Sequence, residues 1–166
     1  MGKLDIGLTV INVVLAIFSM VGAGKSIKYY KKSKNLTIFA KTNKALIEVQ
    51  KMLTKLPEAL YAVNKAKNKQ KKGFNPGYKL CSIGQDLNRS LIEINSNIPP
   101  EYTKAIRNLQ SKEEFDLQTY INSYISGEAI IEDSIDSDKY NLCQKRLNEI
   151  QDYLKRITDE IEEKLK

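Results

Sequence analysis

Residues 140–161 read YNLCQKRLNEIQDYLKRITDEI, and their apolar side chains recur at alternating intervals of three and four residues. This repeat places the apolar side chains in one stripe along an α-helix, because three and four bracket the 3.6-residue turn. The stripe consists of Tyr140, Cys143, Leu147, Ile150, Leu154, Ile157 and Ile161. Charged residues fill the other faces. The stretch therefore predicts a long C-terminal helix that packs either in a coiled coil or in a helical bundle.

The rest of the chain has the same helical character. Eight glycines and four prolines among 166 residues leave long uninterrupted segments, and no segment alternates like a strand. A second repeat of threes and fours runs through residues 46–63, where Pro57 predicts a bent or a new helix. Further helices are expected at residues 79–96, 101–109 and 111–125. A capping box at residues 111–114 opens the last of them. The predicted fold class is all-α.

Residues 6–23, IGLTVINVVLAIFSMVGA, carry no charge. As a helix they would extend about 27 Å, close to the hydrocarbon thickness of a bilayer. Five lysines follow directly, together with Tyr29 and Tyr30, which is typical of the cytoplasmic flank of a membrane helix. These lysines are Lys25, Lys28, Lys31, Lys32 and Lys34. The sequence predicts one span in the cell membrane, with the N-terminus outside and the remainder in the cytoplasm.

Two other interpretations of this stretch stay open. The small residues 22–24 fit a signal-peptide cleavage site, although the lysines follow the apolar run instead of preceding it. Polar residues within the stretch also fit a buried helix of a water-soluble domain. Small and polar residues lie on one face of the predicted span, at intervals of three and four. They are Thr9, Asn12, Ala16, Ser19 and Ala23. Such a face favours close helix association in a membrane, so we expect a homo-oligomer.

The distribution of charge divides the chain into a basic and an acidic part. Residues 25–79 hold fifteen lysines against two glutamates, whereas residues 80–166 hold seventeen acidic and eleven basic side chains. We predict a membrane segment at 1–24, a basic juxtamembrane segment at 25–34 and a cytoplasmic helical domain at 35–166.

A basic loop is expected at residues 65–78 within that domain, because it contains Gly73, Pro76 and Gly77. Its lysines that could contact a polyanion are Lys65, Lys67, Lys69, Lys71 and Lys72. Anionic lipid headgroups are the expected partner of the lysines of this chain. Nucleic acid is possible for the loop but not favoured, because the loop contains no arginine.

The composition also restricts the chemistry. Without histidine, the chain has no imidazole base and no histidine ligand for a metal, so we predict no enzyme, no cofactor and no metal site. An acidic cluster between Glu128 and Asp138 is better explained by helix capping than by metal binding. Cys81 and Cys143 lie far apart in sequence and are expected to be free thiols, although a bridge between them stays open.

Three functions remain open from the sequence, whose Lys-, Ile- and Asn-rich composition is typical of bacterial proteins. The first is a membrane-anchored interaction or scaffold module that self-associates and presents a cytoplasmic bundle to a protein partner. The second is a membrane-permeabilising effector whose oligomerised spans respond to that bundle. The third is a membrane-tethered nucleic-acid-binding protein that uses the lysine-rich loop.

Overall fold

A computed structural model describes the backbone of residues 3–69, 77–112, 115–131 and 137–165. Within these ranges it describes every side chain outside residues 3–18, 20–21, 67–69, 77, 130–131 and 137. The described part is almost entirely helical, which confirms the all-α prediction. Its helices are α1 (Lys3–Lys69), α2 (Gly77–Asn97), a 3-10 turn (Pro100–Tyr102), α3 (Thr103–Gln110), α4 (Leu117–Ser126), α5 (Glu128–Ile131) and α6 (Ser137–Leu165).

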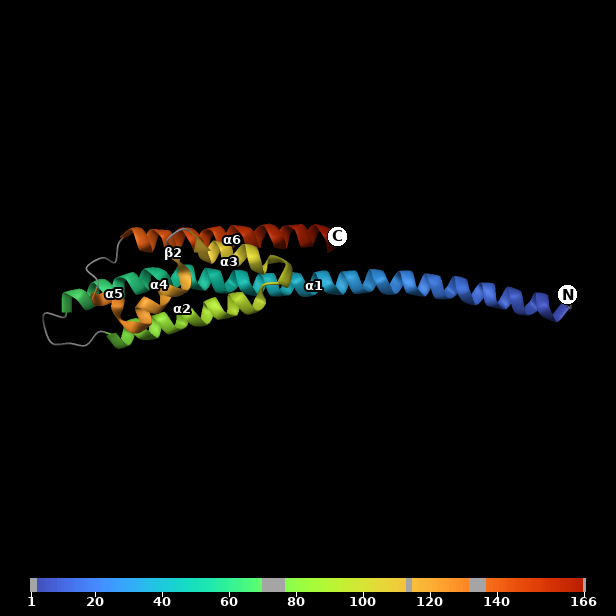
Figure 1. Cartoon of the computed structure of the whole chain (residues 1–166), viewed down its shortest axis with the longest axis horizontal. Coiled ribbons are helices and arrows are strands. Elements are labelled where there is room, and N and C mark those ends of the chain that lie inside the picture. Colours follow the sequence, from blue (N-terminus) through green and yellow to red (C-terminus); the bar gives the residue numbers. More distant parts are fainter. Residues whose placement is uncertain (1–2, 70–76, 113–114, 132–136, 166) are drawn as a thin grey trace.

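Helix α1 dominates the shape of the molecule. It has 67 residues, which corresponds to about 100 Å at 1.5 Å per residue. Its C-terminal half lies in a bundle between α2 and α6, and its N-terminal half projects from the bundle as a single helix (Figure 1). No new helix begins at Pro57, because α1 continues through it with Leu56 and Ala59 buried on either side. Tertiary packing thus outweighs the cost of the missing backbone donor.

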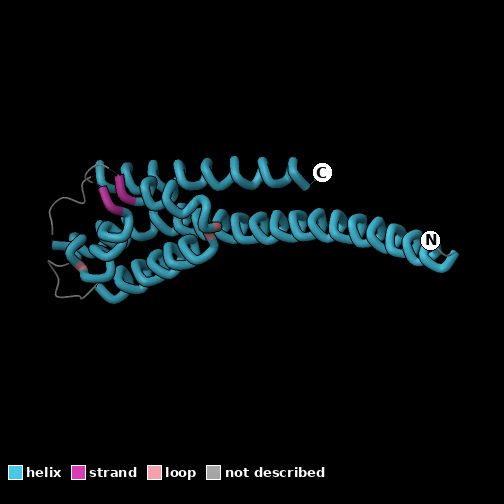
Figure 2. Tube along the Cα trace, turned by 45° about the vertical axis from the view of Figure 1, so that its right-hand side comes forward, coloured by secondary structure: helices cyan, strands magenta, loops and turns pink. Residues whose placement is uncertain are grey.

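The bundle forms as the chain reverses direction around α1. Helices α2 and α6 both run antiparallel to α1, and the C-terminus lies beside the middle of α1 (Figure 1). Helix α4 packs on α2, while α3 packs on α6. A hairpin of two short strands, β1 (Ser111–Lys112) and β2 (Phe115–Asp116), joins α3 to α4 (Figure 2).

The hairpin replaces the capping box that the sequence predicted at residues 111–114. Helix α4 begins later, at Leu117, and the side chain of Asp116 caps it by accepting a 2.7 Å hydrogen bond from the amide of Thr119. Phe115 is buried in the extended segment before this cap, which explains why the helix starts after it. The helix ends at Gly127, whose φ of 80° lies in the left-handed region that glycine favours.

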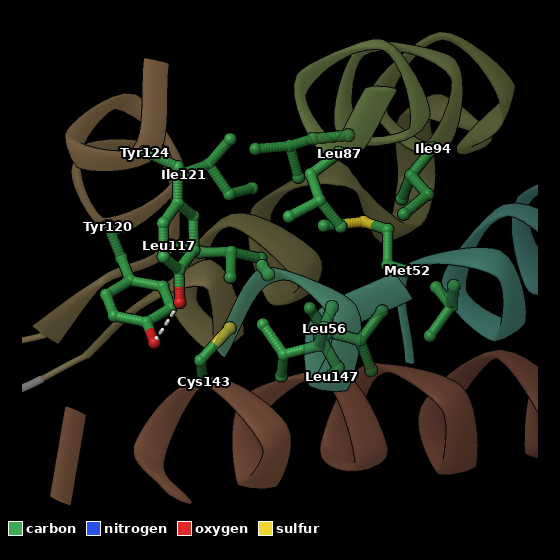
Figure 3. Close-up of a cluster of buried hydrophobic side chains, with 14 of the residues drawn as sticks. Met52, Leu56, Leu87, Ile94, Leu117, Tyr120, Ile121, Tyr124, Cys143 and Leu147 are labelled. Atoms are coloured by element: carbon green, nitrogen blue, oxygen red, sulfur yellow. Dashed lines mark hydrogen bonds between the residues drawn. The ribbon is translucent and has the colours of Figure 1, made fainter. Parts of the chain in front are cut away.

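The core of the bundle follows heptad-like stripes on its two longest helices. On α1 the fully buried stripe is Thr42, Ala45, Val49, Met52, Leu56, Ala59, Val63 and Ala66. On α6, Cys143, Leu147, Ile150, Leu154, Ile157 and Ile161 are each at most 3% exposed, and Tyr140 is half-buried. Of the two arrangements that the sequence left open for α6, the structure shows the bundle. Figure 3 shows how α2 and α4 complete this core with Leu87, Leu117 and Ile121.

The predicted repeat on residues 46–63 is only partly the buried one. Val49, Leu56 and Val63 are buried, whereas Leu46, Leu53 and Leu60 are half-buried. The residues one position earlier, Ala45, Met52 and Ala59, are buried instead. The small side chains of Ala45 and Ala59 allow close approach by the helices that flank α1.

Among the side chains that the structure describes, no helix offers a stretch long and apolar enough to cross a bilayer. Of the predicted span at residues 6–23, only Ser19, Gly22 and Ala23 have described side chains. The rest of that prediction lies outside the described residues.

Candidate functional site on the exposed arm of α1

The part of α1 outside the bundle exposes most of its described side chains. We call residues 22–37 the arm. All of their side chains are exposed except Asn35, which is half-buried. A helix without a packed face gains little stability from its own backbone, so an exposed arm of this length indicates a surface for another molecule.

The arm concentrates positive charge. Its five lysines, Lys25, Lys28, Lys31, Lys32 and Lys34, are all exposed, and the arm contains no acidic residue. At 3.6 residues per turn, Lys25, Lys28 and Lys32 fall within about 60° of the helix circumference. Tyr29 and Tyr30 are each 71% exposed within the same turns. This combination can bind phosphate groups with its lysines while its aromatic rings occupy a polar–apolar boundary.

The predicted association face lies mostly beyond the described side chains. Thr9, Asn12 and Ala16 belong to the helical backbone of α1, but their side chains are outside the described part. Ser19 and Ala23 are both exposed, so neither contacts the bundle. The structure therefore places two members of this face on the free part of α1.

Lys65, the one lysine of the predicted loop with a described side chain, lies far along α1 from the arm. Lys65 is on the last turns of α1, where its Nζ lies 5.9 Å from the centre of the Tyr61 ring. Forty residues of continuous helix separate Lys65 from Lys25, which corresponds to about 60 Å. The side chains of Lys67, Lys69, Lys71 and Lys72 lie outside the described residues. The structure therefore does not bring Lys65 together with the lysines of the arm.

A charged groove between α1 and α2 was not predicted from the sequence. It is an open hollow of about 410 Å³ lined by Lys44, Glu48, Lys51, Lys55, Asp86, Arg89, Ser90 and Glu93. The buried carboxylate of Glu48 accepts a 3.0 Å hydrogen bond from the Ser90 hydroxyl and a 2.6 Å bond from Lys51. These partners are 42 and three residues away in sequence, so only the folded bundle shows that they share one site.

The remaining acids of this groove are also paired. Lys44 Nζ lies 3.0 Å from Glu93 Oε2, and Lys55 bonds Asp86, which also has Arg89 within 3.6 Å. The hydrogen bond from Lys55 lowers the pKa of Asp86, and the bond from Lys44 lowers the pKa of Glu93. Because each of its three acids is paired with a lysine, the groove is best explained as a clamp between α1 and α2.

A second open hollow, of about 430 Å³, lies between α3 and α6. Arg156 covers the ring of Tyr153 there, with its guanidinium carbon 5.6 Å from the ring centre. The side chain of Arg146 is only 2% exposed, and its Nη1 donates a 2.8 Å hydrogen bond to Glu149 on the rim of this hollow. Both contacts lie within α6.

Other predicted positions give no convergent chemistry. Glu128 and Asp138 are exposed, while the acidic residues between them lie outside the described part. No group of three potential metal ligands occurs among the described side chains. Cys81 and Cys143 are both free thiols, and burial raises the pKa of Cys143. The arm thus remains the most exposed concentration of charge and aromatic side chains that the structure describes.

No family model, no curated protein and no solved structure matches this chain.

Proposed function

We propose that this protein is a membrane-anchored helical interaction module. Residues 6–23 span the bilayer, copies associate through the face around Asn12, and α1 carries the bundle on the cytoplasmic side to a protein partner. The observation that supports this proposal best is the continuity of α1. One helix contains the apolar stretch, the basic arm and one wall of the bundle core.

The arm supports the proposal through its chemistry. Each exposed lysine near an anionic membrane surface contributes about 1 kcal/mol of attraction. Five such lysines directly after the apolar stretch would hold the end of the span at the cytoplasmic headgroups. Tyr29 and Tyr30 fit the same depth, because tyrosine places its ring in the boundary region and its hydroxyl in water.

The length of α1 between the apolar stretch and the bundle also sets the distance between the bundle and the membrane. Among the described side chains of α1, Thr42 is the first that is fully buried, and it lies eighteen residues after Gly24. This length of helix corresponds to about 27 Å. The C-terminal end of α6 would then face the membrane, and the end that carries α5 would face away from it (Figure 1). A rigid spacer of this kind suits a module that presents one end of a bundle to a partner.

Extraction of membranes tests the anchor. We expect the full chain to stay with membranes at alkaline pH and its bundle to be cleaved by protease added from the cytoplasmic side. A variant with Val13→Asp and Val14→Asp should be extracted, because each aspartate costs about 3 kcal/mol at the centre of a span. A matched variant with Asn35→Asp and Thr37→Asp carries the same charge change in the arm and should stay in the membrane. Extraction of the unaltered chain would contradict the proposal.

A further inference from the structure

An uncharged stripe runs along the outer side of α1. We call it the seam; it consists of Gly22, Ser26, Tyr29, Ser33, Leu36, Ala40, Asn43 and Ile47, at alternating intervals of four and three. All are exposed except Asn43, which is half-buried, and the larger ones are Tyr29 at 71%, Leu36 at 49% and Ile47 at 51% exposure. The fully buried stripe of α1 begins at Thr42 on the opposite face. The seam is therefore a second, unpartnered heptad stripe.

The seam contains no charged residue, although lysines flank it. Residues 22–47 contain seven lysines, and none of them occupies a seam position. Lys28 and Lys31 instead lie on the face that becomes the core of the bundle further along α1. Since lysine is the most abundant charged residue of this segment, its exclusion from eight consecutive heptad positions indicates a surface that is covered by another helix.

We infer that the seam pairs with the same seam of a second copy of this chain, as a parallel two-stranded coiled coil. The inference rests on the proposed function in one respect: copies anchored in one membrane point in the same direction and start at the same depth. Anchoring therefore sets the parallel orientation and the register. It also raises the effective concentration enough for a seam with small and polar members to associate.

The flanking residues fit this partner. In a parallel, in-register coiled coil, a g-position residue on one helix faces the e-position residue five positions later on the other helix. The facing pairs are Lys25 with Tyr30, Lys32 with Thr37, Phe39 with Lys44, and Leu46 with Lys51. No pair brings two lysines together, despite the seven lysines in this segment. Like-charge repulsion at these positions would otherwise oppose the dimer.

Side-chain sizes along the seam support close packing. Ser26, Ser33 and Ala40 alternate with the larger Tyr29 and Leu36, so a small residue leaves space beside each large one. At Gly22, an added Cβ would meet nothing within 4 Å, so no contact within the described chain requires a glycine at this position. The same holds for Gly24, which lies off the seam. A second helix against the seam would give Gly22 a packing role.

Disulfide trapping in native membranes tests the inference. In a Cys81→Ser background, which leaves only the buried Cys143, we compare Ser33→Cys on the seam with Lys31→Cys on the opposite face. The full chain carrying Ser33→Cys should form several-fold more disulfide-linked dimer on mild oxidation, because only a parallel, in-register pair brings this position against itself. Adding Leu36→Lys to Ser33→Cys should abolish the dimer by placing two lysines in contact.

Equal yields at the two positions, no dimer from Ser33→Cys, or insensitivity to Leu36→Lys would each overturn the seam as an interface between copies. Alkaline extraction of the same membranes reports on the anchor separately. A chain that resists extraction but forms no Ser33 disulfide refutes the seam alone. A chain that is extracted but still forms the specific disulfide refutes the proposed membrane anchor and leaves the seam standing.

Discussion

At the scale of single residues, the hydrogen bond between Ser90 and Glu48 links α1 to α2 inside the charged groove. Ser90→Ala removes a donor from a buried carboxylate, so the free energy of unfolding should fall by about 1–2 kcal/mol. Ser82→Ala is a matched control, because Ser82 is exposed on the same helix and the change in helix propensity is the same. Urea unfolding of the full chain in mild detergent measures both; equal stabilities of the two variants would contradict the role of this bond.

The buried tyrosines of α4 should make the bundle sensitive to alkaline pH. Tyr124 donates a 2.6 Å hydrogen bond to the Tyr120 hydroxyl, and burial raises the pKa of both side chains (Figure 3). In the unfolded chain tyrosine ionises near pH 10, so above about pH 10 only the unfolded state releases these protons. The free energy of unfolding should therefore fall as the pH rises, by up to about 1.4 kcal/mol per pH unit for each group.

The same titration separates these tyrosines from the lysines that ionise in the same range. Tyr124→Phe should reduce the slope of the unfolding free energy against pH between about pH 9.5 and 11. Tyr61→Phe, at a side chain that is 64% exposed, should leave the slope unchanged. Urea unfolding at a series of pH values gives both slopes, and an unchanged slope in Tyr124→Phe would argue against burial as the cause.

The spacing of residues in the sequence predicted the buried stripe of α6 but not the contact between Glu48 and Ser90. The stripe from Cys143 to Ile161 could be identified because its members recur along one helix. Glu48 and Ser90 could not be paired, because nothing local shows which face of α2 meets α1. The charged groove could not be predicted for the same reason, because its members come from two helices and lie up to 49 residues apart in sequence.

At the scale of elements, the packing of α4 on α2 depends on a close approach at Gly84. A Cβ at this position would lie 2.8 Å from Ile125 Cγ1 and 3.1 Å from Tyr124 Cβ. Gly84→Ala should therefore destabilise the bundle by about 1–3 kcal/mol despite the higher helix propensity of alanine. Gly24→Ala, which lies off the seam, meets no atom within 4 Å and should not lower the unfolding midpoint. Thermal unfolding followed by circular dichroism compares them; a stabilised Gly84→Ala variant would contradict the packing.

The boundaries of the elements were less predictable than their type. Residues 111–114 carry a capping signature with Ser111 as its N-cap, whereas the structure uses Asp116, five residues later. Burial of Phe115 in the extended strand β2 favours this later start. Burial raises the pKa of the Asp116 carboxyl, but hydrogen bonds from Thr119, Ser111 and Gln118 outweigh it and leave that pKa below its usual value. The cap is thus stabilised by tertiary structure as well as by its own sequence.

At the scale of the whole molecule, the sequence left open a bent or a new helix at Pro57, and the structure shows one continuous helix there. A new helix at Pro57 would have allowed residues 65–78 to fold back toward the lysines of the arm. Because α1 continues to Lys69, Lys65 instead lies at the far end of the helix. If α1 stands upright on a membrane, the lysines of the arm therefore lie near the membrane surface and Lys65 lies far from it.

Energy transfer to a labelled membrane surface tests the central claim, an anchored helix that holds the bundle away from the bilayer. The full chain with Cys81→Ser is reconstituted in vesicles that carry an acceptor dye on their headgroups, with a donor attached at Lys28→Cys or at Tyr61→Cys. Thirty-three residues of continuous helix separate these positions by about 50 Å. We predict strong transfer from position 28 and weak transfer from position 61; equal transfer from both, or a chain that does not associate with the vesicles, would contradict the account.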